Sequence, residues 1–177
     1  MSVIAHSASD LSREFFSDVF STGPDDLDVR TVEAIGTGQI ASTFRVRLEW
    51  SPLQAHLPTR LVVKLAGEEI DGRDPLRRIA TFRREVGFYR EFGPGGRLPI
   101  PACFHSCADD SGGFTLVMND SSGKTGDQLA GCSDRVARAI VDTAAVVHSA
   151  TWGIDAMSAE HDWLLTEVSR DAEVARR

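Results

Sequence analysis

The sequence has no uninterrupted apolar segment approaching the roughly 18 residues that a membrane helix needs, so a membrane span is not expected. It also lacks a cluster of Lys and Arg, because 19 basic residues stand against 26 acidic ones and the net charge is −7. Binding to a nucleic-acid backbone requires gathered positive charge, so nucleic acid is not an expected partner. The first ten residues, MSVIAHSASD, carry neither a basic leader nor a long apolar run, which predicts a cytoplasmic protein.

Cysteine and lysine are both scarce. Three cysteines, an odd number, do not suggest a disulfide framework. Lys64 and Lys124 are the two lysines, and the remaining basic residues are arginine. Lys64 lies in the apolar segment RLVVKLA, where a buried, unpaired ammonium would cost several kcal/mol. The sequence therefore predicts that an anionic group meets Lys64, unless the side chain reaches water from a strand at the edge of a sheet.

Hydrophobic periodicity predicts an α+β fold. A helix capped by Ser9 and Asp10 is expected first, and strands and helices alternate with turns after it. The expected elements are a helix at 11–20, strands at 27–36, 43–50 and 60–66, a helix at 76–92, strands at 102–108 and 114–119, and helices from Ser133 and from near Ser158. This order indicates an antiparallel five-stranded sheet with one packed helix, followed by the first helices of an all-helical region.

The pair Gly36 and Gly38 raises the question of a phosphate-binding turn. In a dinucleotide-binding fold such a turn leads into a helix, but here it leads into residues 43–50, which alternate as a strand. SGKT at 122–125 matches the end of a P-loop. The first glycine that a P-loop requires is missing, however, because Met118 occupies its position. Both interpretations are therefore disfavoured.

A third arrangement places a glycine turn between two strands, a lysine on the next strand and a glutamate on the following helix. Gly36 to Ser42, Lys64 and Glu85 occur in that order. Glycines let backbone N–H groups approach phosphate oxygens closely, the lysine adds positive charge, and the glutamate holds the ammonium in place. An ordinary tight turn and a solvated Glu85 are the alternatives.

At these positions the chain resembles the aminoglycoside phosphotransferase and choline-kinase-like superfamily, in particular bacterial members related to ecdysteroid kinase-like proteins. The resemblance covers about Val29 to Gly153 and is carried by IGTGQIASTFRVRL, LVVKLAG, FRREVGFYREF, LPIPACFHS, FTLVMND and AAVVHSATWG, in that order. It implies a protein-kinase-like small lobe at 1–118, a hinge and linker at 119–132, and the start of a helical larger lobe at 133–177.

The resemblance also implies site residues and a cofactor. The ATP phosphates would lie under the turn formed by Gly36, Thr37, Gly38, Gln39 and Ser42, and Lys64 would contact the α- and β-phosphates while paired with Glu85. Val117, Met118 and Asn119 would form the hinge, where backbone groups of the last two bond the adenine edge. The expected reaction is transfer of the ATP γ-phosphate, with Mg²⁺, to the hydroxyl of a small molecule. His148 would be a packing residue.

One departure from the family is large. The catalytic loop H-x-D-x-x-x-x-N and the later magnesium-binding aspartate are missing, and EHDW at 160–163 does not substitute. We therefore expect no catalytic or metal-binding residue within the chain, which resembles the front half of such an enzyme. The alternative is a non-catalytic kinase-like module that binds nucleotide or protein. Aminoglycosides, choline, sugars, steroids and other alcohols are all candidate acceptors.

Two other groups of residues invite a site and are expected to form none. Cys103, His105 and Cys107 should share one strand face, but residues four apart on a strand are separated by about 13 Å, against roughly 4 Å between two sulfurs on one zinc. The acidic pairs at 25–26 and 109–110 lie in turns, where aspartate bonds its own backbone.

Overall fold

The computed structural model describes residues 3–36, 40–67, 75–93, 98–121 and 130–153, together with Trp163. Its longer elements are α1 (Arg13–Phe20), β1 (Leu27–Ala34), β2 (Ala41–Trp50), β3 (Arg60–Ala66), α2 (Pro75–Phe92), β4 (Cys103–Ala108), β5 (Phe114–Asn119) and α3 (Asp134–Thr151). Three short 3₁₀ helices occur at Ala8–Asp10, Pro24–Asp26 and Pro52–Gln54. None of the helices among these residues is long and apolar enough to cross a bilayer.

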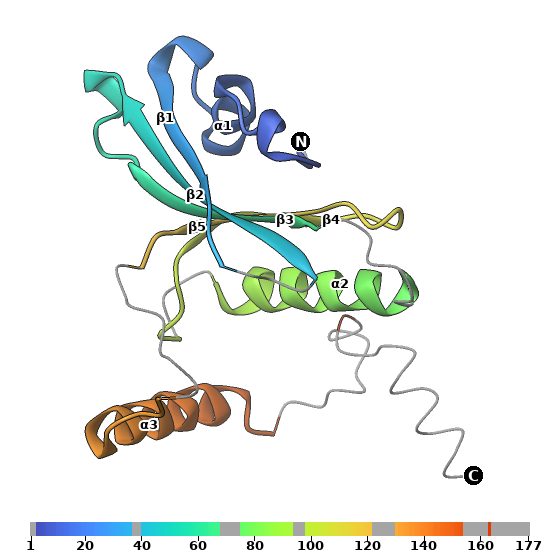
Figure 1. Ribbon diagram of the computed structural model, residues 1–177, viewed down its shortest axis with the longest axis vertical. Coiled ribbons are helices and arrows are strands. Elements are labelled where there is room, and N and C mark those ends of the chain that lie inside the picture. The colour runs from blue at the N-terminus through green and yellow to red at the C-terminus, as the bar shows by residue number, and fades with distance from the viewer. Residues whose placement is uncertain are drawn as a thin grey trace.

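The five strands form one antiparallel sheet in the order β1-β2-β3-β5-β4, which confirms the expected α+β class. β3 lies at the centre, between β2 and β5. The alternative of an edge position for Lys64 is therefore wrong, because β3 has a hydrogen-bonded neighbour on both sides. Figure 1 shows the sheet as the middle layer, with α1 over one face and α2 along the other.

The sheet is covered on both faces, whereas the sequence predicted one packed helix. Phe15 and Phe16 of α1 pack with Val46, Leu61 and other inward residues of β2 and β3 in one core cluster. A second cluster lies under α2 and contains Phe82, Val86, Phe114, Leu116 and Met118. Alternate residues of the central strands thus contribute to opposite faces, as period-two geometry requires.

The N-terminal cap differs from the prediction. Helix α1 begins after Ser12, whose side chain accepts the N–H of Phe15 at 3.3 Å. Asp10 instead accepts the N–H groups of His6 and Ser7, at 2.8 and 2.9 Å, and so closes the 3₁₀ turn that precedes α1. Several residues before α1 can act as helix caps. Asp10 is used by the 3₁₀ turn, so Ser12 is the residue that caps α1.

Helix α3 begins as predicted, with Ser133 as the N-cap. Its apolar stripe is not covered by the described part of the chain, and Ile140 and Val141 are 59% and 65% exposed. The predicted hinge and linker at 119–132 lies largely outside the described residues, and so does the last helix, of which only Trp163 is described.

Candidate functional site

Lys64 of β3 and Glu85 of α2 form an ion pair, in which Nζ of Lys64 contacts Oε1 of Glu85. The predicted pairing of these two residues is thus present. Their side chains are 26% and 28% exposed, so each is partly desolvated but still reachable by a ligand. An ammonium that is already oriented by a carboxylate and open on one side is suited to contact a second anion.

Strand geometry explains why Lys64 faces α2. Leu61, Val63 and Leu65 occupy the other face of β3 and are at most 1% exposed in the cluster under α1. Lys64 alternates with them and therefore points toward α2. There it lies opposite Thr43 on β2 and Leu116 on β5.

The packing of α2 brings Glu85 to the lysine. Phe82 and Phe114 stack with ring centroids 4.3 Å apart and nearly parallel planes, at 7°. Val86, four residues after Phe82, is buried in the same cluster. Because Glu85 lies between these two anchors in sequence, the helix has little freedom to rotate its carboxylate away from β3.

The carboxylate of Glu85 also affects two neighbouring groups. Burial raises the pKa of Tyr89, and the negative charge of Glu85 adds to that effect. For Cys103, burial is again the main cause and the Glu85 charge contributes, which together raise the pKa of the thiol to about 11. The ion pair thus lies beside a half-buried phenol and a half-buried thiol, both held in their neutral forms at pH 7.

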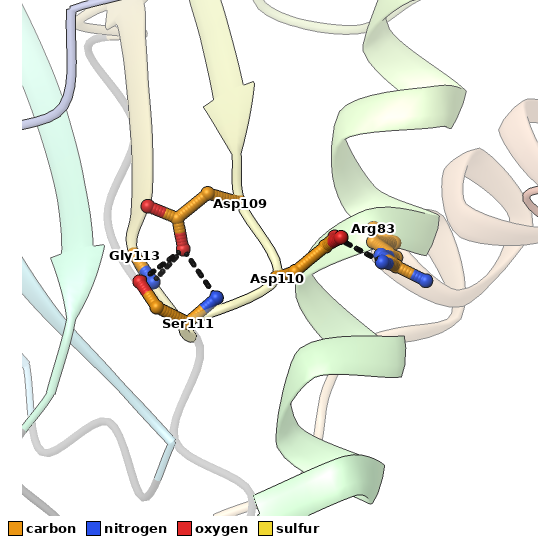
Figure 2. A network of polar contacts seen from close by, with 5 residues as sticks. All are labelled: Arg83, Asp109, Asp110, Ser111 and Gly113. Atoms are coloured by element: carbon orange, nitrogen blue, oxygen red, sulfur yellow. Dashed lines mark hydrogen bonds and ion pairs between the residues drawn. The ribbon is translucent and has the colours of Figure 1, made fainter.

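An exposed ion pair also joins α2 to the β4–β5 hairpin. Figure 2 shows Arg83 of α2 paired with Asp110 at the tip of the β4–β5 hairpin. In the same turn, Oδ1 of Asp109 accepts from the N–H groups of Ser111 and Gly113, at 2.9 and 2.8 Å. The acidic pair at 109–110 is therefore a turn element, as predicted. Asp110 also pairs with the helix that carries Glu85, but the Arg83 and Asp110 side chains are 54% and 89% exposed, so this contact adds little to the core packing of α2.

The glycine turn is described at one end. Gly36 has a φ of 76°, and a Cβ built there would meet nothing within 4 Å, so the surrounding space is open. Thr37, Gly38 and Gln39 lie outside the described residues. Ser42 is the register partner of Leu65, so its side chain lies on the face opposite Lys64. Thr43, which sequence reasoning did not select, is the β2 residue directly across from Lys64.

The predicted hinge residues lie at the end of β5. Val117 is fully buried toward α1, and Met118 is 6% exposed in the cluster under α2. The N–H of Asn119 donates to the carbonyl oxygen of Ala102 at 2.8 Å. This N–H therefore already has a partner in the residue before β4; the resemblance implies, without naming an atom, that backbone groups of Met118 and Asn119 bond an adenine edge.

Sequence reasoning missed a buried charge at the next position. The side chain of Asp120 is 2% exposed, and its Oδ2 accepts from Nε of Arg45 at 3.1 Å and from Nη2 of Arg60 at 2.8 Å. Asp120 falls in the predicted hinge and linker at 119–132, where an aspartate is normally solvated. The partners lie 75 and 60 positions away, so no local pattern could have revealed the cluster.

The prediction that Cys103, His105 and Cys107 share a strand face is wrong. The register shifts between Cys103 and His105, because two steps along β4 correspond to one step along β5, from Met118 to Val117. This bulge places Cys103 under α2, while Nε2 of His105 lies 2.7 Å from the Val3 carbonyl oxygen on the other side. Within the described ranges, no group of three His, Cys, Asp or Glu side chains could hold a metal.

A cavity of about 650 Å³ lies along α2 near the end of β4. It is lined by Arg83, Val86, Gly87, Arg90, Glu91, Ala108 and Trp163. None of these is a predicted nucleotide-binding residue, so the cavity adds nothing to the case for the Lys64 site.

No protein-family model matches this chain, and a search of curated proteins finds no match either.

Proposed function

We propose that this chain binds ATP through its α2-facing sheet surface, as the nucleotide-binding lobe of a small-molecule kinase does. The observation that carries the proposal is the Lys64–Glu85 pair at the centre of the sheet. Lys64 lies on a central strand, is about one quarter exposed and is oriented by the carboxylate of a helix residue. A phosphate site built from a glycine turn between two strands needs such a lysine and glutamate.

The described residues suit the phosphate end of ATP better than a metal ion. Lys64 offers a partly exposed ammonium, and the open space around Gly36 allows close approach of phosphate to the backbone. For Mg²⁺, the nearby carboxylates are already engaged, with Glu85 on Lys64 and Asp120 on two arginines. When bound with ATP, the expected Mg²⁺ would add positive charge between the phosphates. Its protein ligands are not found among the described residues.

Phosphoryl transfer needs a base near the acceptor hydroxyl and metal ligands. The 177 residues contain no H-x-D-x-x-x-x-N sequence. For this chain the proposal is therefore nucleotide binding. We propose transfer of the γ-phosphate to a hydroxyl only for a protein that combines this lobe with a catalytic base and metal ligands. The alternative is a non-catalytic module that binds nucleotide or protein.

The test is a titration of a fluorescent ATP analogue against the wild-type chain and Lys64→Ala. Arg30→Ala is the matched control, because Arg30 is also an ion-paired cation of this sheet but is 54% exposed and pairs with Glu49. We expect Lys64→Ala to weaken binding by about tenfold or more, the loss of one charge-assisted contact, and Arg30→Ala to have no effect. Equal affinities of wild type and Lys64→Ala would refute the role of Lys64.

A further inference from the structure

Asp120 lies directly after β5. Of the ion-paired side chains in the described part of the chain, that of Asp120 is the most deeply buried. A carboxylate removed from water is costly unless it is paired and hydrogen-bonded. Here two guanidinium groups from two different strands donate to the same oxygen. We call Asp120, Arg45 and Arg60 the Asp120 clamp.

The clamp holds the end of β5 through both side chain and backbone. Besides the two arginine contacts, the N–H of Asp120 donates to the carbonyl oxygen of Arg60 at 3.1 Å. On the opposite side, the N–H of Asn119 donates to Ala102. Strand ends normally fray where the ladder stops, so these contacts extend the ordered part of β5 by one residue beyond its last register pair, Leu61 with Asn119.

The clamp shares a sheet face with Lys64. Leu116 lies across from Lys64, Met118 lies across from Val62, and Asp120 is the next alternate position along the same strand. Arg45 likewise follows Thr43 by two residues on β2 and lies across from Val62. The row of Arg45, Val62 and Met118 therefore lies between the ion pair of Lys64 and the other two members of the clamp, Asp120 and Arg60.

This placement gives the face two charged ends with an apolar step between them. The Lys64 end suits phosphates. In the apolar step Met118 is only 6% exposed beneath α2 whereas Val62 is partly buried, so Val62 is the residue that offers apolar surface to the flat face of a base. The clamp then determines where the chain leaves the sheet beside that step. If Asp120 lost its partners, the backbone at 119–121 would no longer be held at a set distance from Lys64.

We infer that Asp120 is a positioning residue for the nucleoside end of the ATP site: through Arg45 and Arg60 it fixes the end of β5 relative to Lys64. The inference rests on the proposed function. It assigns nucleoside affinity to the clamp and phosphate affinity to Lys64, and the two can be separated by measurement.

The experiment uses the full chain and two competitors of a fluorescent ATP analogue, unlabelled ATP and inorganic tripolyphosphate. The variants are Asp120→Asn, which keeps the shape and removes the charge, and Glu49→Gln as a control. Glu49 is also paired with an arginine of this sheet, Arg30, but is 62% exposed.

For Asp120→Asn we expect the Kd for ATP to rise about tenfold, the scale of one lost charged hydrogen bond, while the Kd for tripolyphosphate stays unchanged. Glu49→Gln should alter neither, and Lys64→Ala should weaken both competitors. A merely structural role for Asp120 would weaken ATP and tripolyphosphate by the same factor or leave both unchanged, and either result overturns the inference.

Two further outcomes are decisive. If the wild-type chain binds neither competitor, the proposed function fails and the inference falls with it; if wild type binds ATP and Asp120→Asn binds it equally well, the inference alone fails. Should Asp120→Asn not fold, Arg60→Gln replaces it, because Arg60 is 46% exposed and its loss leaves the Arg45 contact in place. The same ATP-specific loss supports the inference, and unchanged ATP affinity overturns it.

Discussion

Lys64 and Glu85 are 21 positions apart in sequence, and their side chains meet where β3 faces α2. The pair links the centre of the sheet to the helix that covers it. Because both side chains are partly desolvated, the contact should be worth more than an exposed ion pair on the same sheet.

The first prediction concerns the difference in coupling free energy between the Lys64–Glu85 pair and an exposed ion pair. A double-mutant cycle of Lys64→Met and Glu85→Gln should give a coupling free energy of about 1–2 kcal/mol, and the cycle of Arg30→Met and Glu49→Gln less than about 0.5 kcal/mol. The measurement is urea unfolding of each single and double variant. Equal coupling in the two cycles would show that the Lys64–Glu85 contact is screened like a surface pair.

A second prediction concerns the pH dependence of Asp120. Burial alone would raise its pKa, but the hydrogen bond from Arg60 and the positive charges of Arg45 and Arg60 outweigh burial, so the pKa lies below the ordinary 3.8. A depressed folded-state pKa contributes stability that is complete above the unfolded-state value and is lost as pH falls through the folded-state value.

Asp120→Asn should therefore lower the free energy of unfolding by about 1–3 kcal/mol at pH 7. The gap between variant and wild type should shrink as pH falls below the ordinary 3.8 and through the lower folded-state pKa, since the wild-type carboxylate becomes protonated there. Urea unfolding at several pH values measures this gap. A gap that does not change with pH would contradict the pairing.

The third prediction concerns thiol reactivity. Cys103 is half-buried with a pKa of about 11, so about one molecule in a thousand carries its thiolate at pH 8. Cys132 is exposed. Iodoacetamide followed by peptide mass spectrometry should label Cys132 long before Cys103, and the difference should disappear in urea. Similar rates in the folded chain would place Cys103 outside the α2 interface.

The fourth prediction concerns the β4–β5 turn. A Cβ added at Gly113 would lie 2.6 Å from Oδ2 of Asp109, closer than contacting atoms allow. Gly113→Ala should therefore lower the free energy of unfolding by about 1–3 kcal/mol, as overpacking does. Val141→Ala, at a largely exposed position of α3, should change it by less than about 0.5 kcal/mol. Thermal unfolding of both variants checks the difference, and equal melting temperatures would contradict it.

The fifth prediction concerns the uncovered stripe of α3. Ile140 and Val141 are more than half exposed and adjacent, so replacing both with serine removes apolar surface from water contact without opening a core. We expect lower binding of a hydrophobic dye and unchanged unfolding by urea. Loss of stability in the double variant would show that the stripe is packed in solution.

Most of the secondary structure could be predicted, because each element carries its own periodicity. The strand at 60–66 alternates between residues that pack under α1 and residues that face α2, and the helix at 76–92 repeats apolar residues at three and four positions. The candidate pair of Lys64 and Glu85 was also accessible, since an ammonium in an apolar strand requires a partner.

Other features depend on contacts between distant segments. A bulge turns Cys103 to the α2 face, although a regular alternation predicts that it faces the same way as His105. Asp120 reads as a linker residue and is buried because arginines from β2 and β3 reach it. Neither the shift of register nor the choice of ion-pair partners has a local signature.

By itself, the sequence determined which segments are strands and helices, since polar and apolar spacing acts within a few residues. Tertiary structure alone decided which charges are buried, which helix covers which face, and where β5 ends relative to Lys64. The physical reason is that desolvation depends on what packs against a group, and for Lys64 and Asp120 those partners come from other elements of the fold.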